Sequence, residues 1–399
     1  MERTQCIVVG GGPAGMMLGL VLARAGVEVT VLEKHDDFLR DFRGDTVHAS
    51  TLTLLDELGL GDRFAAVPHQ RLERLRLPLR RNAPLDVDLR LLRGPHKHIA
   101  MVPQWDLLDM LADVALEEPS FSLRMGAEVF ALLREGGRVA GVRYGDDGGD
   151  HELRAPLTVA CDGRGSHVRA ASGLRVREFG VPLDVWWFRL PRREGDPDGV
   201  SGRVGGGATL IMIDRGSYFQ LGYQIRKGAD AELRAAGIET LRERVAALAP
   251  ELADRVGELG GWEDVSLLTV RLNRMPRWFS GGLLCIGDAA HAMSPVGGVG
   301  INLAVQDAVA AGRVLATPLR RGDVRARDLA RVQARRWAPT AFTQSLQRLI
   351  HRAVIRPGLE QRPTHDVRLP RRAVARLFAL GLLPEHAPRF ARRAHGSGA

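Results

Sequence analysis

The sequence predicts an α/β fold in which an antiparallel sheet is inserted into a nucleotide-binding domain and a helical region follows. Three observations lead to this prediction. An apolar strand near the start runs directly into a glycine-rich turn, the middle of the chain changes to β-like segments, and the tail is helical and rich in arginine. We therefore expect three units, which occupy residues 1–71 with 98–175 and 265–320, residues 72–97 with 176–264, and residues 321–399.

The N-terminal stretch has the pattern of a dinucleotide-binding turn. The apolar run Cys6–Val9 is followed by a G-x-G-x-x-G motif with the residues Gly10, Gly12, Pro13, Ala14 and Gly15. Glycines at this spacing allow a tight turn, a close approach of the backbone to a pyrophosphate, and close packing of helix on strand. The helix that follows offers unpaired N–H groups and the positive end of its dipole to phosphates. A second apolar strand, residues 27–32, ends at Glu33 and Lys34, so an acid stands about 20 residues on, where a ribose hydroxyl needs an acceptor.

The following elements are expected from periodicity and turn signals. Helices are expected at 50–60, 103–112, 239–248 and 301–315, and strands at 72–92, 126–133, 138–144, 156–161, 185–190, 209–213, 218–225 and 279–287. Residues 196–207 are expected to form a loop because they contain glycine and proline. The tail is expected to break at Pro339, Pro357, Pro363, Pro370 and Pro384.

Composition narrows the classes of function. The chain of 399 residues has a formal charge of +9 and a pI of about 10.3, which raises nucleic-acid binding, but basic and acidic residues are mixed through most of the sequence. We therefore expect no nucleic-acid partner. The cysteines Cys6, Cys161 and Cys285 each lie in an apolar run, which favours free thiols in a reducing compartment. No secretory leader, no metal-ligand spacing and no apolar run of about 20 residues is found, so a cytoplasmic protein without membrane insertion or metal is expected.

A second glycine-rich stretch lies near residue 290. An apolar strand ends at Gly287-Asp288, and Pro295 and the segment Gly297–Asn302 follow before a helix. Asp288 can accept hydrogen bonds from sugar hydroxyls, and the glycines allow backbone to lie against a flat ring. The residues Gly298, Val299, Gly300, Ile301 and Asn302 are the candidates for that backbone.

With this stretch the sequence resembles the single-component flavoprotein monooxygenases of the aromatic-hydroxylase type, the group that includes para-hydroxybenzoate hydroxylase. The resemblance rests on three ordered motifs: Gly10–Gly15, Ala160–Arg169 with Asp162-Gly163, and Gly287–Asn302. It spans residues 1 to about 320. It implies a Rossmann-like FAD-binding domain of the glutathione-reductase type, with an inserted antiparallel β-sheet substrate domain and a helical C-terminal region. It further implies FAD as cofactor, NAD(P)H as co-substrate, and oxygen that reacts as a flavin hydroperoxide.

The resemblance implies a role for several further residues. Glu33 matches the acid that binds the adenosine ribose, and Arg43 matches an arginine that reaches the pyrophosphate and ribityl region. Gln104 matches a glutamine at the ribityl chain, Val129 a position whose backbone meets the adenine, and Asp288 a contact near the ribityl chain. Pro295 corresponds to the flavin edge where oxygen reacts. Asp162 belongs to a motif linked to both FAD and NAD(P)H, and the basic residues after it, Arg164, His167 and Arg169, fit either a nicotinamide-cofactor site or an ordinary helix start.

No side chain is assigned a certain catalytic role, because the flavin itself carries the chemistry. The candidates on the substrate side are Gln220, Tyr218, His48 and Pro295. Alternation places Tyr218 and Gln220 on one face of a strand, although Gln220 also fits a solvated face and His48 a structural histidine. Leu210, Met212 and Phe219 favour an apolar, bulky substrate.

The leading hypothesis is hydroxylation or epoxidation of an aromatic or polyketide-like small molecule, with that molecule and O2 as the partners. Three alternatives stay open. One is a flavin reductase or dehydrogenase of the same fold, similar to reductases of isoprenoid double bonds. Another is a flavin-dependent halogenase, because Trp186–Pro191 approaches the W-x-W-x-I-P motif of those enzymes. The third is a flavin-binding protein without catalysis. The sequence also leaves open a homodimer, the substrate, and the choice between NADH and NADPH.

Overall fold

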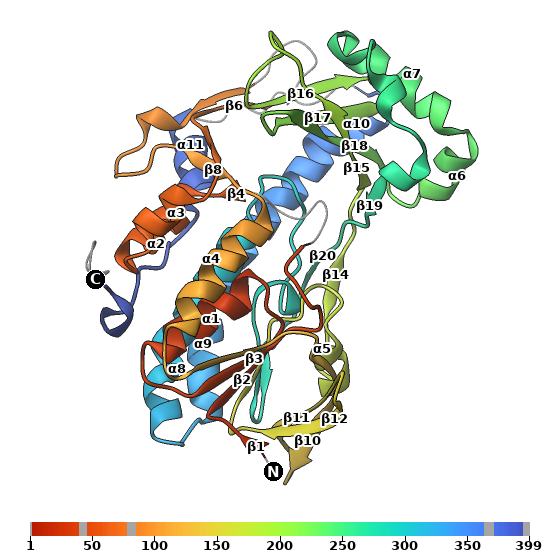
Figure 1. The fold of residues 1–399 in the computed structure, drawn as a ribbon. Helices are drawn as coiled ribbons and strands as arrows, with labels where there is room; N and C mark the ends of the chain where they lie inside the picture. Colours follow the sequence, from red (N-terminus) through yellow and green to blue (C-terminus); the bar gives the residue numbers. More distant parts are fainter. Residues whose placement is uncertain (1, 40–45, 78–84, 363–370, 394–399) are drawn as a thin grey trace.

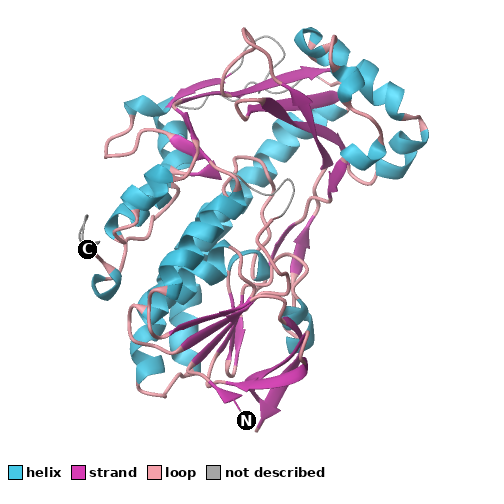
Figure 2. Ribbon diagram, viewed as in Figure 1, coloured by secondary structure: helices cyan, strands magenta, loops and turns pink. Residues whose placement is uncertain are grey.

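The computed structural model describes residues 2–39, 46–77, 85–362 and 371–393 (Figure 1). Arg43, which the resemblance places at the cofactor, lies outside the described residues. The molecule has a lower body around a parallel sheet and an upper body around an antiparallel sheet, and long helices run between them (Figure 2).

The lower body is organised by a six-stranded sheet in the order β21-β22-β13-β2-β3-β9. The strands β2 (Cys6–Val9), β3 (Val29–Leu32), β9 (Phe121–Arg124), β13 (Thr158–Ala160) and β22 (Leu283–Cys285) are parallel, and β21 (Phe279–Ser280) is antiparallel to β22. Because carboxyl ends of parallel strands meet at one edge, the segments at Gly10, Glu33, Asp162 and Gly287 are brought together there. Three sequence motifs from distant parts of the chain thus share one edge.

Helices and a second sheet cover this parallel sheet. The helices α1 (Pro13–Ala23), α4 (Gln104–Leu116) and α8 (Gly300–Arg320) pack side by side in the core. A four-stranded sheet in the order β1-β12-β11-β10 lies at the bottom of Figure 2. It consists of β1 (Glu2–Arg3), β10 (Glu128–Glu135), β11 (Arg138–Asp146) and β12 (Gly149–Arg154), next to α5 (His167–Ser172). The strands predicted at 126–133 and 138–144 are present as β10 and β11, which pair with each other, and β12 extends the pair.

The upper body is a five-stranded antiparallel sheet in the order β16-β17-β18-β15-β19. Its strands are β15 (Leu183–Pro191), β16 (Val200–Gly205), β17 (Ala208–Asp214), β18 (Tyr218–Arg226) and β19 (Ser266–Leu268). The expectation of a loop over 196–207 was wrong for its second half, because β16 pairs with β17 there. Gly206 and Gly207 form the connecting turn with φ of +56° and +76°, which glycine adopts readily in tight hairpins.

One side of this sheet is closed and the other faces a cavity. The helices α6 (Asp230–Ala235) and α7 (Ile238–Leu248) cover the closed side, where a separate apolar core forms. The two bodies are joined through the paired strands β14 (Arg177–Phe179) and β20 (Leu272–Arg274).

The short helical turns are η1 (Leu89–Leu91), η2 (Pro250–Leu252), η3 (Val256–Glu258), η4 (Trp262–Asp264), η5 (Gly287–Ala289) and η7 (Arg389–Ala391).

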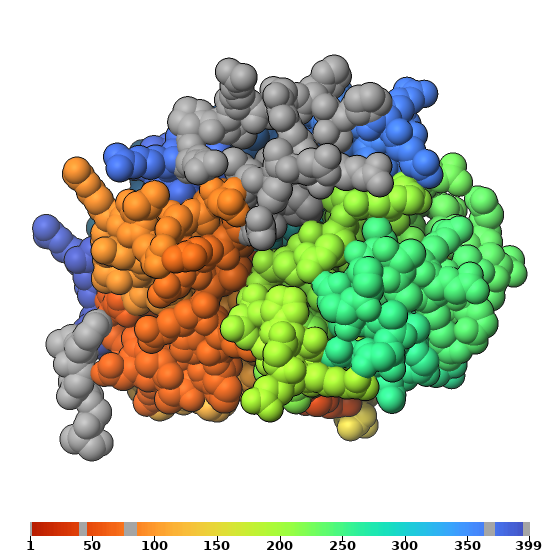
Figure 3. All heavy atoms as spheres, turned by 90° about the horizontal axis from the view of Figure 1, so that it is seen from above, coloured from red at the N-terminus to blue at the C-terminus, as the bar shows by residue number. Residues whose placement is uncertain are grey.

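A third group of elements lies beside the five-stranded sheet. It contains β4 (Thr46–Val47), α2 (Ala49–Glu57), α3 (Gly61–Ala66), β5 (Gln70–Leu72) and β8 (Ile99–Met101), with β8 between β4 and β5. The hairpin β6 (Arg74–Leu77) and β7 (Leu85–Asp88) is its own two-stranded ladder beside β16. The prediction of strands over 72–92 is confirmed for β6 and β7 but was wrong for Leu89–Leu91, which form a helical turn. The two strands do not join the five-stranded sheet by a hydrogen-bonded ladder. Figure 3 shows these orange elements beside the green sheet from above.

The C-terminal region is helical. The helix α9 (Ala326–Ile350) continues through a π-helical turn η6 (His351–Ile355) into α10 (Arg356–Leu359), and α11 (Arg371–Leu380) follows. The expected breaks at Pro339 and Pro357 were wrong, because Pro339 lies inside α9 and Pro357 inside α10. A proline removes one intrahelical hydrogen bond, and side-chain bonds from Gln333, Arg336 and Gln344 to the rest of the protein hold α9 in place. Pro363 and Pro370 are outside the described residues, and Pro384 follows α11.

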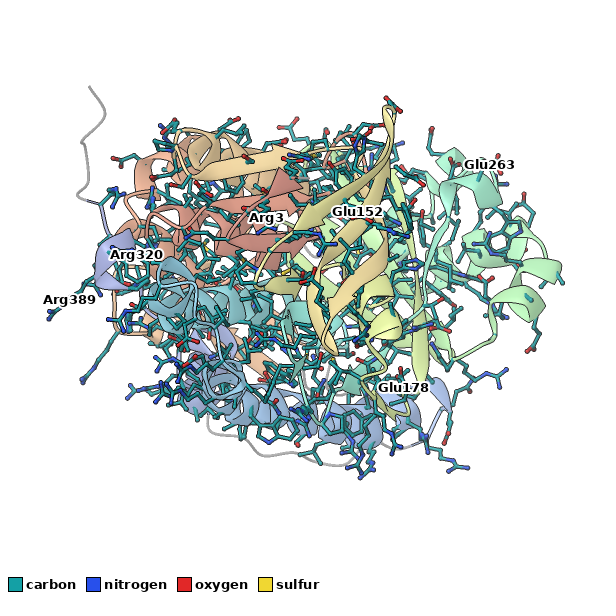
Figure 4. All side chains as sticks on the ribbon, turned by 90° about the horizontal axis from the view of Figure 1, so that it is seen from below. Arg3, Glu152, Glu178, Glu263, Arg320 and Arg389 are labelled. Atoms are coloured by element: carbon teal, nitrogen blue, oxygen red, sulfur yellow. The ribbon has the colours of Figure 1, made fainter. Side chains whose placement is uncertain are left out.

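Charged side chains lie mainly at the periphery. The labelled residues Arg3, Glu152, Glu178, Glu263, Arg320 and Arg389 lie around the outside of the molecule (Figure 4).

The three cysteines are buried and unpaired, as their strand positions predicted. Among the described residues, no helix combines the length and the apolar character that crossing a membrane requires. The same residues contain no group of three or more His, Cys, Asp or Glu side chains placed to hold a metal ion.

Candidate active site

A cavity of about 1530 Å³ extends from the carboxyl edge of the parallel sheet to the open face of the antiparallel sheet. Its lining begins at Val9 and includes residues as late as Phe378. Most predicted cofactor residues line it: Gly10, Gly12, Pro13, Ala14, Glu33, Lys34, Gln104, Val129, Asp162, Asp288, Pro295, Gly298, Val299, Gly300 and Ile301. Gly15 and Asn302 are absent from the lining, and their contacts show why.

The glycines of the first turn meet three different environments. Gly10 has φ +101°, and a Cβ there would lie 2.6 Å from the carbonyl oxygen of Cys161. A Cβ on Gly15 would lie 1.9 Å from the carbonyl oxygen of Gly10, so this glycine allows the helix to pack on the strand. A Cβ on Gly12 would meet no protein atom within 4 Å, although Gly12 lines the cavity. The turn therefore leaves free space at Gly12, where a ligand can approach the backbone.

Two helices begin at the cavity without a side-chain cap. Gly12 is the N-cap of α1, and Val299 is the N-cap of α8. The first N–H groups of a helix have no partner inside the helix, and together with the helix dipole they favour an anion or a polar oxygen. The cavity thus has two separate sites that favour negative charge.

Asn302 holds the start of α8 against the preceding segment. Its Oδ1 accepts hydrogen bonds from the His48 amide at 2.8 Å and from Thr51 Oγ1 at 2.7 Å, and its Nδ2 donates to the Thr46 carbonyl at 3.1 Å. Thr46 Oγ1 in turn donates to the Gly298 carbonyl at 2.6 Å. The side chain of Asn302 is therefore structural in this arrangement, and it fixes the glycine-rich backbone that lines the cavity.

The acidic residues at the strand ends differ in their surroundings. Glu33 accepts the Gly11 amide at 2.7 Å on Oε2 and the His35 amide at 3.2 Å on Oε1, so its carboxylate is held at the cavity. Asp162 accepts from Ser166 Oγ at 2.5 Å and from the Val168 amide at 3.1 Å, so it supports Ser166, the N-cap of α5. Burial raises the pKa of Asp162 above its usual range, while these hydrogen bonds act in the opposite direction.

The basic residues of the middle motif separate into two groups. Arg169 is buried, and it donates to the carbonyls of Ala289 and Arg164, each at 2.8 Å, so it ties this motif to the Gly287-Asp288 turn. Arg164 and His167 line the cavity. Of the two interpretations left open by the sequence, the structural one fits Arg169, whereas Arg164 and His167 lie where a ligand can contact them.

The sheet face at the cavity alternates as the strand period requires. On β18 the lining residues are Gln220, Gly222 and Gln224, and on β17 they are Thr209, Ile211 and Ile213. Leu210, Met212 and Phe219 instead lie in the closed core with α7. The prediction that these three residues contact the substrate was therefore wrong, because alternation along the strands places them on the opposite face of the sheet.

The remaining candidates on the substrate side have different positions. Gln220 lines the cavity, and its Oε1 accepts from Arg215 Nε at 3.0 Å and Nη2 at 2.9 Å. Tyr218 is outside the lining, and the Arg189 guanidinium lies 5.1 Å from its ring centre. His48 is also outside the lining: its Nδ1 contacts the Phe378 carbonyl at 2.6 Å, and its ring stacks on Phe378. Burial lowers the pKa of His48 to about 4, so it is neutral near pH 7.

A buried charge network lies behind the Gly287-Asp288 turn. Asp307 accepts from the Gly287 amide at 3.1 Å, and it contacts His291 Nε2 at 2.5 Å and Arg336 Nε at 2.9 Å. The side chains of Asp307 and Arg336 are both 0% exposed. The neighbouring His291 and Arg336 hold the pKa of Asp307 below its usual range against the effect of burial. The network therefore joins the turn at the cavity to helix α9.

Several lining residues were missed from the sequence. Trp187 and Gln224 lie on the open sheet face, and the Trp187 ring covers Gly222, whose added Cβ would lie 2.9 Å from it. The series Gln220-x-Gly222-x-Gln224 was a usable signal, because polar residues and glycine at period 2 mark one face. The C-terminal residues Ile350, Val354, Ile355 and Phe378 also line the cavity. Trp186 of the halogenase-like segment faces away and donates to Asp230 at 2.6 Å.

Comparisons with known proteins give the family. A family model described as an FAD binding domain matches residues 3–345. The 6-methylpretetramide 4-monooxygenase of Streptomyces rimosus is 36% identical over 360 residues, which cover 89% of this chain and 85% of that protein. The chain belongs to the FAD-dependent monooxygenases of the aromatic-hydroxylase type.

Two further similarities agree with this membership. This chain is 31% identical over 332 residues to the 12-dehydrotetracycline 5-monooxygenase/anhydrotetracycline 6-monooxygenase of Streptomyces rimosus subsp. rimosus. That match covers 78% of this chain and 62% of the relative, so the chain spans less than two thirds of that protein's length. The solved structure of OxyS anhydrotetracycline hydroxylase from Streptomyces rimosus superposes with a TM-score of 0.72 at 25% identity, over 97% of this chain and 77% of that chain.

The site of the monooxygenase fits FAD on grounds of its own geometry. The space beside Gly12, the uncapped starts of α1 and α8, and the carboxylate of Glu33 suit a pyrophosphate, a flavin edge and a ribose. FAD is an extended molecule, and the cavity extends in the same way from the glycine turn to the sheet. When bound, FAD supplies the redox chemistry with oxygen, and the protein supplies binding, orientation and a dry environment.

Proposed function

We propose that this monooxygenase hydroxylates a fused-ring aromatic polyketide, with NAD(P)H as the reductant of FAD. The observation that carries the proposal is the large cavity, which adjoins both the predicted cofactor residues and a broad sheet face with apolar and amide side chains. The printed names of two relatives concern 6-methylpretetramide and tetracycline-type molecules, which are larger than single-ring phenols.

The predicted cofactor roles belong to this proposal. The Gly10–Gly15 turn would hold the pyrophosphate, with Glu33 at the adenosine ribose and Val129 at the adenine. Gln104 and Asp288 would contact the ribityl chain, and the segment from Pro295 to Ile301 would lie along the flavin. The position of these residues around one cavity supports the assignment. We also propose that the upper sheet forms the core of the substrate unit. The predicted bound at residue 264 is too early, because β19 (Ser266–Leu268) belongs to the same sheet.

Gln220 would contact the substrate as a hydrogen-bond donor. Arg215 directs two N–H groups at Gln220 Oε1, and this contact fixes which end of the amide carries the oxygen. The Nε2 group is then the part of Gln220 that can serve a ligand, and it can only donate. A carbonyl or phenolic oxygen on the substrate is the matching acceptor, and aromatic polyketides carry many such oxygens.

The side chains of the sheet face would orient the substrate and exclude water. Trp187, Ile211 and Ile213 offer flat or apolar surface, and Leu72 of β5 and Leu75 of the β6–β7 hairpin add further apolar lining. Burial of this apolar area favours a multi-ring substrate over water. Exclusion of water also suppresses side reactions in which oxygen is reduced without transfer to the substrate.

The test uses purified, FAD-loaded protein. We would measure oxidation of NADPH and of NADH, oxygen uptake and product mass with anhydrotetracycline, and with para-hydroxybenzoate as the single-ring control. The proposal expects stimulation by the four-ring compound, oxygen uptake and a product heavier by one oxygen atom. Stimulation by the benzoate alone would overturn the substrate class, and NAD(P)H oxidation without oxygen uptake would overturn the monooxygenase assignment.

A matched pair of variants tests Gln220. Gln220→Glu keeps a partner for Arg215 and removes the donor, whereas Gln220→Leu removes both. We expect both variants to raise the KM for the substrate by roughly 5- to 10-fold, the effect of one lost hydrogen bond, with normal FAD content. An unchanged KM in both variants would show that Gln220 does not contact the substrate.

A further inference from the structure

We propose that Gln347 and His351 of the C-terminal helix are positioning residues for the reacting end of the cavity. They hold the segment 292–296, which carries Pro295, at the place where the flavin would meet oxygen. The inference rests on the proposed location of the flavin along Pro295–Ile301. It assigns a functional part to helix α9, which contributes no predicted cofactor residue.

The segment 292–296 depends on side chains for several of its backbone hydrogen bonds. It forms neither helix nor strand, and Met293, Ser294, Pro295 and Val296 all line the cavity. The Ser294 amide donates to Gln347 Oε1 at 3.2 Å. Gln347 Nε2 donates to the carbonyls of Ser294 at 2.9 Å and Val296 at 2.8 Å. One glutamine therefore takes the place of a neighbouring strand on both sides of Pro295.

Two further residues of the same helical line extend this contact. Gln344 Nε2 donates to the Ala292 carbonyl at 3.1 Å and to the Asn273 carbonyl at 2.6 Å. His351 Nε2 lies 2.9 Å from Ser294 Oγ. Residues 344, 347 and 351 follow one another at the spacing of a single helix face, and all three are buried. Helix α9 thus presents a polar inner face whose partners lie on the segment at the cavity.

The turn that follows α9 also contributes to the cavity. His351 begins the π-helical turn η6, and Ile350, Val354 and Ile355 line the cavity. A π-helical turn widens the helix at one point, and such turns occur frequently at functional sites. Here the wider turn allows His351 to contact Ser294 while its neighbours contact the cavity. The same short stretch therefore contacts both the proposed flavin segment and the substrate space.

These contacts bear on the reaction through placement. Transfer of the oxygen atom requires that the reacting edge of the cofactor and the substrate are held at a fixed distance and orientation and that water is excluded. Small displacements from this geometry lower the rate. A segment without regular structure has low intrinsic rigidity, so the hydrogen bonds from α9 set its position. Loss of these bonds would allow oxygen chemistry to proceed without transfer to substrate, which releases hydrogen peroxide.

The experiment compares five variants of the FAD-loaded protein. Gln347→Leu and His351→Leu remove the contacts, while Gln347→Glu keeps an acceptor for the Ser294 amide and His351→Gln keeps a donor of similar reach. Ser345→Ala is the matched control on the same helix, because Ser345 is exposed and bonds only to the Ala341 carbonyl within the helix. For each variant we would measure hydrogen exchange in a peptide covering 290–303, the absorption spectrum of bound FAD, the melting temperature, and the ratio of product to NAD(P)H consumed.

We expect exchange in 290–303 to rise at least about 5-fold in Gln347→Leu, from the loss of one or more hydrogen bonds, with smaller changes elsewhere in the protein. The product ratio should fall while peroxide rises, and His351→Gln should retain more of the ratio than His351→Leu. Exchange and product ratio that stay at the wild-type level in both leucine variants would overturn the proposal. A lower melting temperature with uniformly faster exchange and an unchanged product ratio would also overturn it, because the residues would then be structural only.

The exchange measurement separates this proposal from the proposed function. If the wild-type protein gives no oxygenated product, the function assignment fails, yet the exchange in 290–303 still reports whether α9 holds this segment. If the wild type gives product and the exchange is unaffected by Gln347→Leu, the positioning role fails and the function stands.

Discussion

Replacement of Gly12 by alanine should weaken FAD binding without weakening the fold. Gly12 has φ −71° and ψ −176°, a conformation that alanine adopts without strain, and an added Cβ meets no protein atom within 4 Å. The stability of the apoprotein should therefore change by no more than about 1 kcal/mol, because alanine restricts the unfolded chain but is a poorer N-cap than glycine. The methyl group instead occupies space in the cavity, where the pyrophosphate is proposed to lie.

The size of the binding defect follows from contact distances. A carbon atom keeps an oxygen at about 3.3 Å or more, whereas an N–H···O bond needs about 2.9 Å. A displaced phosphate loses one charge-assisted hydrogen bond or more, and each contributes about 1.5–3 kcal/mol. The dissociation constant of FAD should then rise by roughly 10- to 150-fold.

The assay is titration of apoprotein with FAD, followed by flavin fluorescence, alongside thermal unfolding of the apoprotein. Gly180→Ala is the control, because Gly180 also has open space for a Cβ but lies away from the cavity lining. Gly15→Ala should instead prevent normal folding, since its Cβ would lie 1.9 Å from a carbonyl oxygen. An unchanged dissociation constant for Gly12→Ala would refute the placement of the pyrophosphate, and an unfolded apoprotein would refute the open space.

Three further predictions concern the core, the pH response and the sheet face. Arg336→Met should cost about 3–5 kcal/mol in denaturant unfolding, because the buried carboxylate of Asp307 loses its cation, and the double variant with Asp307→Asn should lose less than the two single changes added together. Burial lowers the pKa of His48 to about 4, so the unfolded chain takes up the proton first and stability should fall as pH drops from about 6.5 to about 4. His48→Asn should reduce this pH-dependent loss of unfolding free energy by up to about 3 kcal/mol. An equal loss in both proteins between pH 6.5 and pH 4 would contradict the prediction. Gly222→Ala should push the Trp187 ring into the cavity, since ring atoms lie 2.9 and 3.0 Å from the added Cβ, and raise the substrate KM with normal FAD content; an unchanged KM would argue against that ring as a substrate contact.

The parts of the fold that the sequence predicted are those determined by local pattern. The glycine turn at Gly10, the strand before it and the acid at Glu33 are close in sequence, and each has a specific physical reason. The strands β15, β17 and β18 were expected from their composition. The hairpin at Gly206-Gly207 was missed because two glycines in a polar stretch were taken for a loop, although that pair is also a turn signal.

The open face of the sheet could not be assigned from alternation alone. A period of 2 separates two faces, but it does not say which face another element covers. Leu241 and Val245 of α7 pack on the face that carries Leu210 and Met212, and this contact joins distant parts of the chain. The inner face of α9 was hidden for a different reason: its contacts are made by glutamine, histidine and arginine, so hydrophobic periodicity gives no sign of it.

The cavity lining reaches from Val9 to Phe378, and this span has a consequence for how the enzyme is made. During synthesis the glycine turn leaves the ribosome well before the helices that contribute Ile350 and Phe378. A chain that ends before these helices has the glycine turn but lacks part of the cavity lining. The cavity is therefore fully lined only after the segments that carry Ile350 and Phe378 have been made and have packed against the glycine turn.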